Sequence, residues 1–182
     1  MNKKFVLSFA LLGVFFSPSV FAIDVNINIT GEVYIPPCRI NSDSAIDISF
    51  GKIANFKIDG RNYSQQKTVN VQCDYYDGIP YIKVSGRLLT GASDNVLYAN
   101  AEANSGKLGI ALYQGNNVID SYRLKIGIGE QGKFGYPLNQ GFSESGSSRQ
   151  FTFTSVPYVI GNNSDLVGAP FSASATMDIY YL

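Results

Sequence analysis

The chain has 182 residues, with 14 basic and 14 acidic side chains and no histidine. This balanced charge gives no reason to expect nucleic acid or an anionic membrane surface as a partner. The lack of histidine removes His-based triads and most zinc sites, so we expect no enzyme and no metal or cofactor site. Twelve Tyr, twelve Phe and 18 Gly favour an all-β domain with many turns.

The first residues predict a secretory signal peptide. Lys3 and Lys4 precede an apolar run over residues 5–16, which is far shorter than the roughly 20 residues of a membrane span. Small residues at the −3 and −1 positions predict cleavage after Ala22. We therefore expect residues 1–22 to be removed on export, leaving one domain with no membrane span and a net charge near −2.

The stretch that follows, residues 24–35, alternates between apolar and polar side chains. Such a period of two predicts a half-buried strand. A Pro pair separates this strand from Cys38, so residues 23–37 form an extension ahead of the remaining domain. The apolar members share one parity with a single glycine: Val25, Ile27, Ile29, Gly31, Val33 and Ile35.

Cys38 and Cys73 are the two cysteines of the chain. In an exported protein such a pair is expected to form a disulfide, whereas a catalytic redox pair would usually have the CxxC spacing. The bridge would close a loop of about 35 residues and stabilise the fold by about 3–4 kcal/mol in the chain-entropy model.

The rest of the chain predicts short strands joined by turn-rich loops, without an amphipathic helix or an internal repeat. This spacing favours a sandwich, most of all an immunoglobulin-like one. Residues 51–66 are mixed and polar, with a turn expected at 60–62. Loops are expected at residues 86–106 (with a short edge segment at 96–98), 129–149 and 161–170. Strands are expected at residues 39–40, 46–50, 68–73, 81–84, 108–113, 118–119, 122–128 and 150–158.

The final segment, residues 171–182, alternates as regularly as the first. Two arrangements are open. The two terminal strands pair within one closed sandwich, which the pattern alone slightly favours, or the sandwich is incomplete and its open edge is covered by another chain. The apolar parity of this segment consists of Phe171, Ala173, Ala175, Met177, Ile179 and Tyr181.

Several motifs occur in the order and spacing of a known family. They are the Pro-Pro-Cys38 sequence after the alternating arm, Val71-Gln72-Cys73, the strands at 109–115 and 151–158, and the penultimate Tyr181. Together they resemble the chaperone–usher pilins. More narrowly, the arm and the 151–157 strand resemble those of a minor subunit of the pilus tip.

The resemblance implies an incomplete immunoglobulin-like fold, spanning residues 38–182 and lacking its seventh strand. A periplasmic chaperone would lend a strand to the groove beside residues 171–181. At the outer-membrane usher, the arm of the next subunit would replace it. Val25, Ile27, Ile29, Gly31 and Val33 would in turn bind the groove of a neighbouring subunit.

The function implied is that of a tip adaptor, which joins an adhesin to the tip fibrillum of a fimbrium on the bacterial surface. A major rod subunit or another structural subunit remains the nearest alternative, and a terminating subunit is less favoured because the arm is intact. A glycan-binding adhesin would add a receptor domain ahead of the pilin domain, whereas about 15 residues lie between the expected cleavage site and Cys38.

Overall fold

A computed structural model describes residues 25–129, 132–145 and 148–182, so the expected signal peptide lies outside the described residues. The chain divides into two units, Met1–Val33 and Tyr34–Leu182, and each is described by itself. In the first unit, residues 25–33 form neither helix nor strand. The side chains of Val25, Ile27, Ile29 and Val33 are 79%, 81%, 89% and 100% exposed. The predicted strand is therefore not formed in the free chain, because no second backbone pairs with it.

The second unit is all-β apart from single turns of 3-10 helix. Its strands are β1 (Arg39–Ile40), β2 (Gln65–Gln72), β3 (Pro80–Gly86), β4 (Val96–Tyr98), β5 (Leu108–Gln114), β6 (Tyr136–Pro137), β7 (Phe142–Ser145), β8 (Ser148–Val159) and β9 (Ala175–Tyr181). Its 3-10 turns are η1 (Asn41–Asp43), η2 (Asn55–Lys57), η3 (Glu102–Asn104), η4 (Asp120–Tyr122), η5 (Gly132–Phe134) and η6 (Asn163–Asp165).

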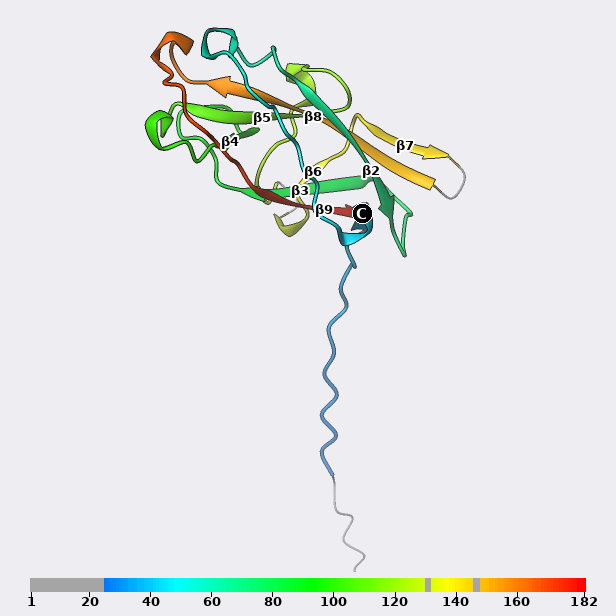
Figure 1. Cartoon of the computed structure of the whole chain (residues 1–182). Helices are drawn as coiled ribbons and strands as arrows, with labels where there is room; N and C mark the ends of the chain where they lie inside the picture. The colour runs from blue at the N-terminus through cyan, green and yellow to red at the C-terminus, as the bar shows by residue number, and fades with distance from the viewer. Residues whose placement is uncertain (1–24, 130–131, 146–147) are drawn as a thin grey trace, which may run out of the picture. The chain divides into compact units, whose positions relative to one another are not determined.

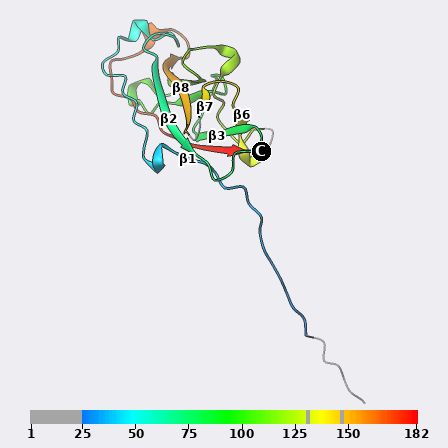
Figure 2. The same cartoon turned by 90° about the vertical axis from the view of Figure 1, so that its right-hand side faces the viewer.

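The strands of the second unit form two layers. One sheet has the order β1-β2-β8-β5-β4, and β7 pairs with β8 beside this path; the other has the order β6-β3-β9. Figure 1 shows β5, β8 and β2 above β3 and β9. Seen from the side, β9 runs past β1 to the C terminus (Figure 2). All pairs between these strands are antiparallel, as in a sandwich of hairpins and crossovers.

Long β8 organises the larger sheet. Its inward side chains Phe151 and Phe153 stack with ring centroids 5.9 Å apart, and both are buried. They face Ile82 and Val84 of β3 in one core cluster, so alternate residues of both sheets fill the space between the layers. The further buried members of this cluster are Cys38, Val69, Val71, Leu97, Ile110, Leu112, Leu124, Ile126, Leu138, Ile179 and Tyr181.

The strands predicted at 68–73, 81–84, 108–113 and 150–158 agree with β2, β3, β5 and β8. Five other predictions were wrong. Residues 46–50 form no strand, and the expected loop over 129–149 contains β6 and β7. The terminal strand is also shorter than the predicted 171–182, because Ser172 leaves the direction of β9 to exchange two backbone hydrogen bonds with Asn100, at 2.7 and 3.0 Å.

Residues 118–119 and 122–128 also form no strand in the structure. Within the second of these segments, Arg123 forms a β-bridge with Tyr113 of β5, whereas Ile126 forms one with Val84 of β3. The segment therefore passes from one sheet to the other and cannot continue either ladder. Its period-two pattern was real, since Leu124 and Ile126 are both buried, but it reflected a crossing between the layers.

Candidate functional site

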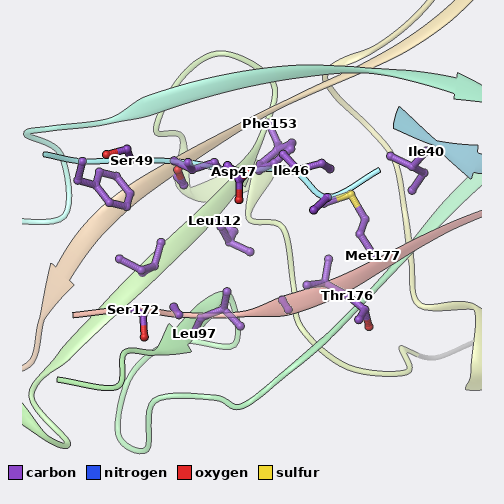
Figure 3. Close-up of a pocket in the computed structure, with 18 of the residues that line it drawn as sticks. Ile40, Ile46, Asp47, Ser49, Leu97, Leu112, Phe153, Ser172, Thr176 and Met177 are labelled. Carbon is purple, nitrogen blue, oxygen red and sulfur yellow. The ribbon is translucent and has the colours of Figure 1, made fainter. Parts of the chain in front are cut away.

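A groove of about 1620 Å³ runs along the open side of β9 in the second unit. One wall is the chain from Pro37 to Ile53, and the other is the segment from Ala169 to Asp178. Figure 3 shows Ile46, Asp47 and Ser49 along the first wall, with Ser172, Thr176 and Met177 along the second. The floor is apolar and consists of Val84, Leu97, Ile110, Leu112 and Phe153, with Ser155 beside them.

Each end of the groove has a contact between the two walls. At one end, the backbone N–H of Cys38 donates a hydrogen bond to the carbonyl oxygen of Ile179 at 2.7 Å. At the other, the rings of Phe50 and Phe171 lie 6.1 Å apart, centroid to centroid. Between these contacts the two walls are separated by the groove, which explains why residues 46–50 form no ladder.

The groove exposes an edge of the smaller sheet. β9 pairs with β3 on one side over its whole length, from Pro80 opposite Tyr181 to Gly86 opposite Ala175. Within the described part of the second unit, no strand occupies the other side of β9. Backbone N–H and C=O groups along such an edge are available to a strand from another chain.

The structure separates the six predicted groove residues into two sets. Phe171, Ala173, Ala175 and Met177 line the groove. Ile179 and Tyr181 continue the same parity but are buried in the core, with 0% and 3% exposure. The difference arises because the sandwich closes over the end of β9 at Cys38, beyond the end of the groove.

Sequence reasoning missed the opposite wall and the floor of the groove. Ile46, Ile48 and Phe50 are half-buried and alternate with exposed residues, so they are presented as a strand would present them. Their period-two pattern was visible in the sequence, but it does not say whether a neighbouring strand is present. The floor residues come from β3, β4, β5 and β8, and only the three-dimensional fold brings them together.

The disulfide is formed between Cys38 and Cys73, with the two Cα atoms 4.2 Å apart. It joins the start of the first groove wall to the residue that follows β2, beside the antiparallel pair of Arg39 with Gln72. The covalent link therefore fixes the wall to the larger sheet at the same place where Cys38 contacts Ile179.

Tyr181 closes the core beyond the groove and makes a polar contact at its tip. Its hydroxyl donates a 2.6 Å hydrogen bond to Oε1 of Glu144 on β7, and Nε of Arg149 lies 3.2 Å from the same oxygen. Burial, followed by the hydrogen bond to Glu144, raises the pKa of Tyr181 to about 12. The hydrogen bond from Tyr181 lowers the pKa of Glu144, with Arg149 acting in the same direction.

A charged pair lies on the other face of β9. Nζ of Lys83 is 3.0 Å from Oδ2 of Asp178 across the β3–β9 pair. The hydrogen bond to Asp178 raises the pKa of Lys83. Among the described residues, no group of three or more His, Cys, Asp or Glu side chains is arranged to hold a metal ion. In the same ranges, no helix is long and apolar enough to cross a bilayer.

The predicted donor residues belong to the first unit, which is described apart from the groove. Val25, Ile27, Ile29 and Val33 present exposed apolar side chains. A Cβ added to Gly31 would meet no atom within 4 Å. No contact within the described part of the first unit therefore explains the glycine.

An open sandwich edge beside an apolar groove is the arrangement that strand addition requires. The model of the Fimbrial protein family matches residues 27–182. The chain belongs to this family and is a fimbrial subunit.

Named relatives agree with this assignment. The chain is 39% identical to the fimbrial adapter PapF of Escherichia coli, over 87% of this chain and 88% of PapF. It is 37% identical to the minor fimbrial protein PrsF of Escherichia coli, over the same shares of the two chains.

Solved structures show the same fold. A structure of the P pilus adaptor subunit PapF matches with a TM-score of 0.53 and 33% identity, covering 83% of this chain and all of PapF. The P pilus rod subunit PapA matches with a TM-score of 0.55, covering 86% of this chain and all of PapA, but at 16% identity it supports the fold alone. The all-β, immunoglobulin-like pilin fold expected from the sequence is confirmed.

Proposed function

We propose that this protein is a minor fimbrial subunit that joins a tip adhesin to the tip fibrillum by donor-strand exchange. Its groove takes up the arm of one neighbouring subunit, and its own arm, residues 23–37, enters the groove of the other. Because donor and acceptor surfaces differ, the contact is heterologous and repeats head to tail, as a fibre requires.

The observation that carries this proposal is the groove between Cys38–Ile53 and Phe171–Asp178. It combines an apolar floor with an open backbone edge on β9, which are the two features that an added strand needs. At about 3.3 Å per residue, the wall from Phe171 to Asp178 spans at most roughly 23 Å. An extended segment as long as residues 25–33 spans roughly 26 Å, which is enough to cover the wall.

The arm has the chemistry of a donor strand. Val25, Ile27, Ile29 and Val33 share one parity, so an extended arm presents all four to one face. At about 1.5–3 kcal/mol each, their full burial contributes roughly 6–12 kcal/mol before the cost of ordering the arm. Gly31 lies in the same row, where the lack of a side chain suits a shallow part of the partner's groove.

Before assembly the groove needs another occupant, since an open edge above an apolar floor promotes aggregation. We infer that a periplasmic chaperone supplies this strand and that the outer-membrane usher exchanges it for a subunit's arm. This route agrees with the signal peptide predicted at residues 1–22 and with the disulfide, which forms in an oxidising compartment. The mature subunit would then lie in the fimbrium on the cell surface and support adhesion.

Sequence identity supports the adaptor role over the rod role. In the comparisons with solved structures, the identity is 33% for the adaptor PapF and 16% for the rod subunit PapA, although both share the fold. This chain therefore shares more side chains with the adaptor than with the rod subunit, and side chains determine which partner a subunit binds. A rod subunit would be expected to accept the arm of another copy of itself.

The proposal is tested by purifying the periplasmic subunit with its chaperone and adding synthetic arm peptides. We expect an arm peptide of a neighbouring fibrillum subunit to displace the chaperone and form a one-to-one complex. The subunit's own arm peptide should do so much more slowly. Rapid exchange with its own peptide would indicate a rod subunit, and no exchange with any arm peptide would contradict the strand-accepting function.

A further inference from the structure

We propose that the loop from Asp74 to Ile79 is a second contact surface for the subunit that accepts this protein's arm. The inference rests on the proposed function, because it concerns the junction that donor-strand exchange creates. The loop would pack on the rim of the neighbour's groove and fix the angle between the two domains. Its exposed apolar side chains are Tyr75, Tyr76 and Ile79, with exposures of 52%, 58% and 57%.

The loop is held at both ends. The residue before it, Cys73, is bonded to Cys38, where the arm joins the domain. At its other end, Ile79 and Leu182 exchange backbone hydrogen bonds of 2.9 and 3.1 Å. Gly78 has a φ of +107°, and a Cβ at this position would lie 2.3 Å from the carbonyl oxygen of Leu182. The loop is therefore a defined surface, pressed against the C terminus at the end of the domain where the arm begins.

One of the two tyrosines is held in position before any partner binds. The guanidinium of Arg149 lies 4.0 Å from the centre of the Tyr76 ring, and Glu144 in turn contacts Nε of Arg149 at 3.2 Å. A side chain that is already ordered loses less entropy when a partner packs on it. Tyrosine also presents a flat apolar ring with a polar tip, and it is enriched at protein interfaces.

Chain length identifies the occupant of this surface. Only residues 34–37 separate Val33, the last donor position, from Cys38, and Pro36 and Pro37 stiffen this linker. At about 3.6 Å per residue, the Cα of Val33 can lie no more than about 18 Å from that of Cys38. The Cα of Cys73 is 4.2 Å from that of Cys38, and the tyrosines follow within three residues. The rim of the groove that holds the arm thus comes within reach of the loop.

The test uses the full subunit and, as the probe, the chaperone-bound pilin domain of the tip adhesin. After exchange, we expect backbone amides of residues 74–79 to exchange hydrogen at least about tenfold more slowly than in this subunit's own chaperone complex. The double variant Tyr75→Ser/Tyr76→Ser should still form the two-subunit complex, because its arm is unchanged. Small-angle scattering should then show a broader range of inter-domain angles. The control Phe56→Ser removes a ring on η2 that is 66% exposed, and this variant should keep the wild-type scattering curve.

The outcomes separate this inference from the proposed function. Protection of the amides of residues 25–33 after exchange would show that the arm is a donor strand. If the amides of residues 74–79 are not protected at the same time, and if the double variant has the wild-type scattering curve, the loop contact is wrong. If the backbone amides of residues 74–79 are already fully protected from hydrogen exchange in the chaperone complex, the loop contacts the chaperone and the inference is wrong. If the wild-type arm fails to enter the adhesin domain, both the adaptor function and the loop contact are rejected.

Discussion

The backbone N–H of Cys38 donates a 2.7 Å hydrogen bond to the carbonyl oxygen of Ile179, and the two chain segments separate from this point to form the walls of the groove. The disulfide of Cys38 to Cys73 holds the same point against the larger sheet. One end of the incomplete sandwich is thus closed covalently and by a hydrogen bond, while the edge of β9 along residues 175–178 stays open.

A charged substitution at one of the apolar residues of the arm should block assembly. Ile29→Asp places a charge where an apolar side chain worth about 1.5–3 kcal/mol would be buried, so uptake by the neighbouring subunit should fall by at least about tenfold. Asn28→Asp adds the same charge on the opposite parity and is the matched control. Exchange rates of the two variants, measured with the neighbour's chaperone complex, check this prediction. Equal rates would show that arm parity does not matter.

Groove variants should impair capture by the chaperone. Met177 is half-buried and lines the groove, so Met177→Asp should lower the amount of chaperone-bound subunit recovered from the periplasm several-fold. Ser174→Asp, at an exposed position in the same segment, is the control for the added charge. Recovery is measured by co-purification with the chaperone. Similar yields for both variants would count against a role of the groove in chaperone binding.

Removing the disulfide should destabilise the domain while leaving the apolar floor of the groove unchanged. The double variant Cys38→Ser/Cys73→Ser frees a loop with a sequence separation of 35. This should reduce the free energy of unfolding by about 3–4 kcal/mol. Urea unfolding of the subunit with a donor peptide bound, compared with wild type, gives the difference. A loss below about 1 kcal/mol would mean that the contact between Cys38 and Ile179 holds this end without the covalent bond.

The contact between Tyr181 and Glu144 predicts a pH dependence of stability. The pKa of Glu144 is lowered in the folded state from its ordinary value of 4.5 by the hydrogen bond from Tyr181. The resulting stabilisation is fully present above pH 4.5 and is lost as the pH falls through the folded-state pKa. Wild type should therefore exceed Glu144→Gln in free energy of unfolding at pH 7, and the difference should shrink below pH 4.5.

The comparison requires urea unfolding curves at several pH values, with a donor peptide bound throughout. Tyr181→Phe is the matched variant, because it keeps the buried ring and removes only the hydroxyl. In that background, Glu144→Gln should have a smaller effect. A difference between wild type and Glu144→Gln that stays constant from pH 7 to pH 3 would contradict the assigned linkage.

The sequence predicted the long paired strands well, but it missed the short paired strands β6 and β7 and predicted strands in two unpaired segments. Period-two alternation located β2 and β8. In contrast, β5 was predicted from a compact apolar run, and it is buried over its whole length. The same alternation at residues 46–50 and 122–128 did not mark strands, since side-chain parity records burial and not backbone pairing. The wall at 46–50 borders the groove, and the segment at 122–128 crosses between the sheets.

The candidate site was predicted in part for the same reason. Parity identified Phe171, Ala173, Ala175 and Met177 as groove residues, but it also included Ile179 and Tyr181, which are core residues. Where the groove ends depends on the contact of Cys38 with Ile179, a pairing between segments far apart in the sequence. The alternation of apolar and polar residues within one segment does not predict such a contact.

Donor-strand exchange requires residues 25–33 to become a strand within a neighbouring subunit. Backbone hydrogen exchange of these amides should be measured first in the chaperone-bound subunit and then in the assembled fibre. We expect exchange within seconds before assembly and a slowing of at least about a hundredfold afterwards, because both edges of the arm then pair with groove walls. Exchange that is equally fast in the fibre would contradict donor-strand exchange.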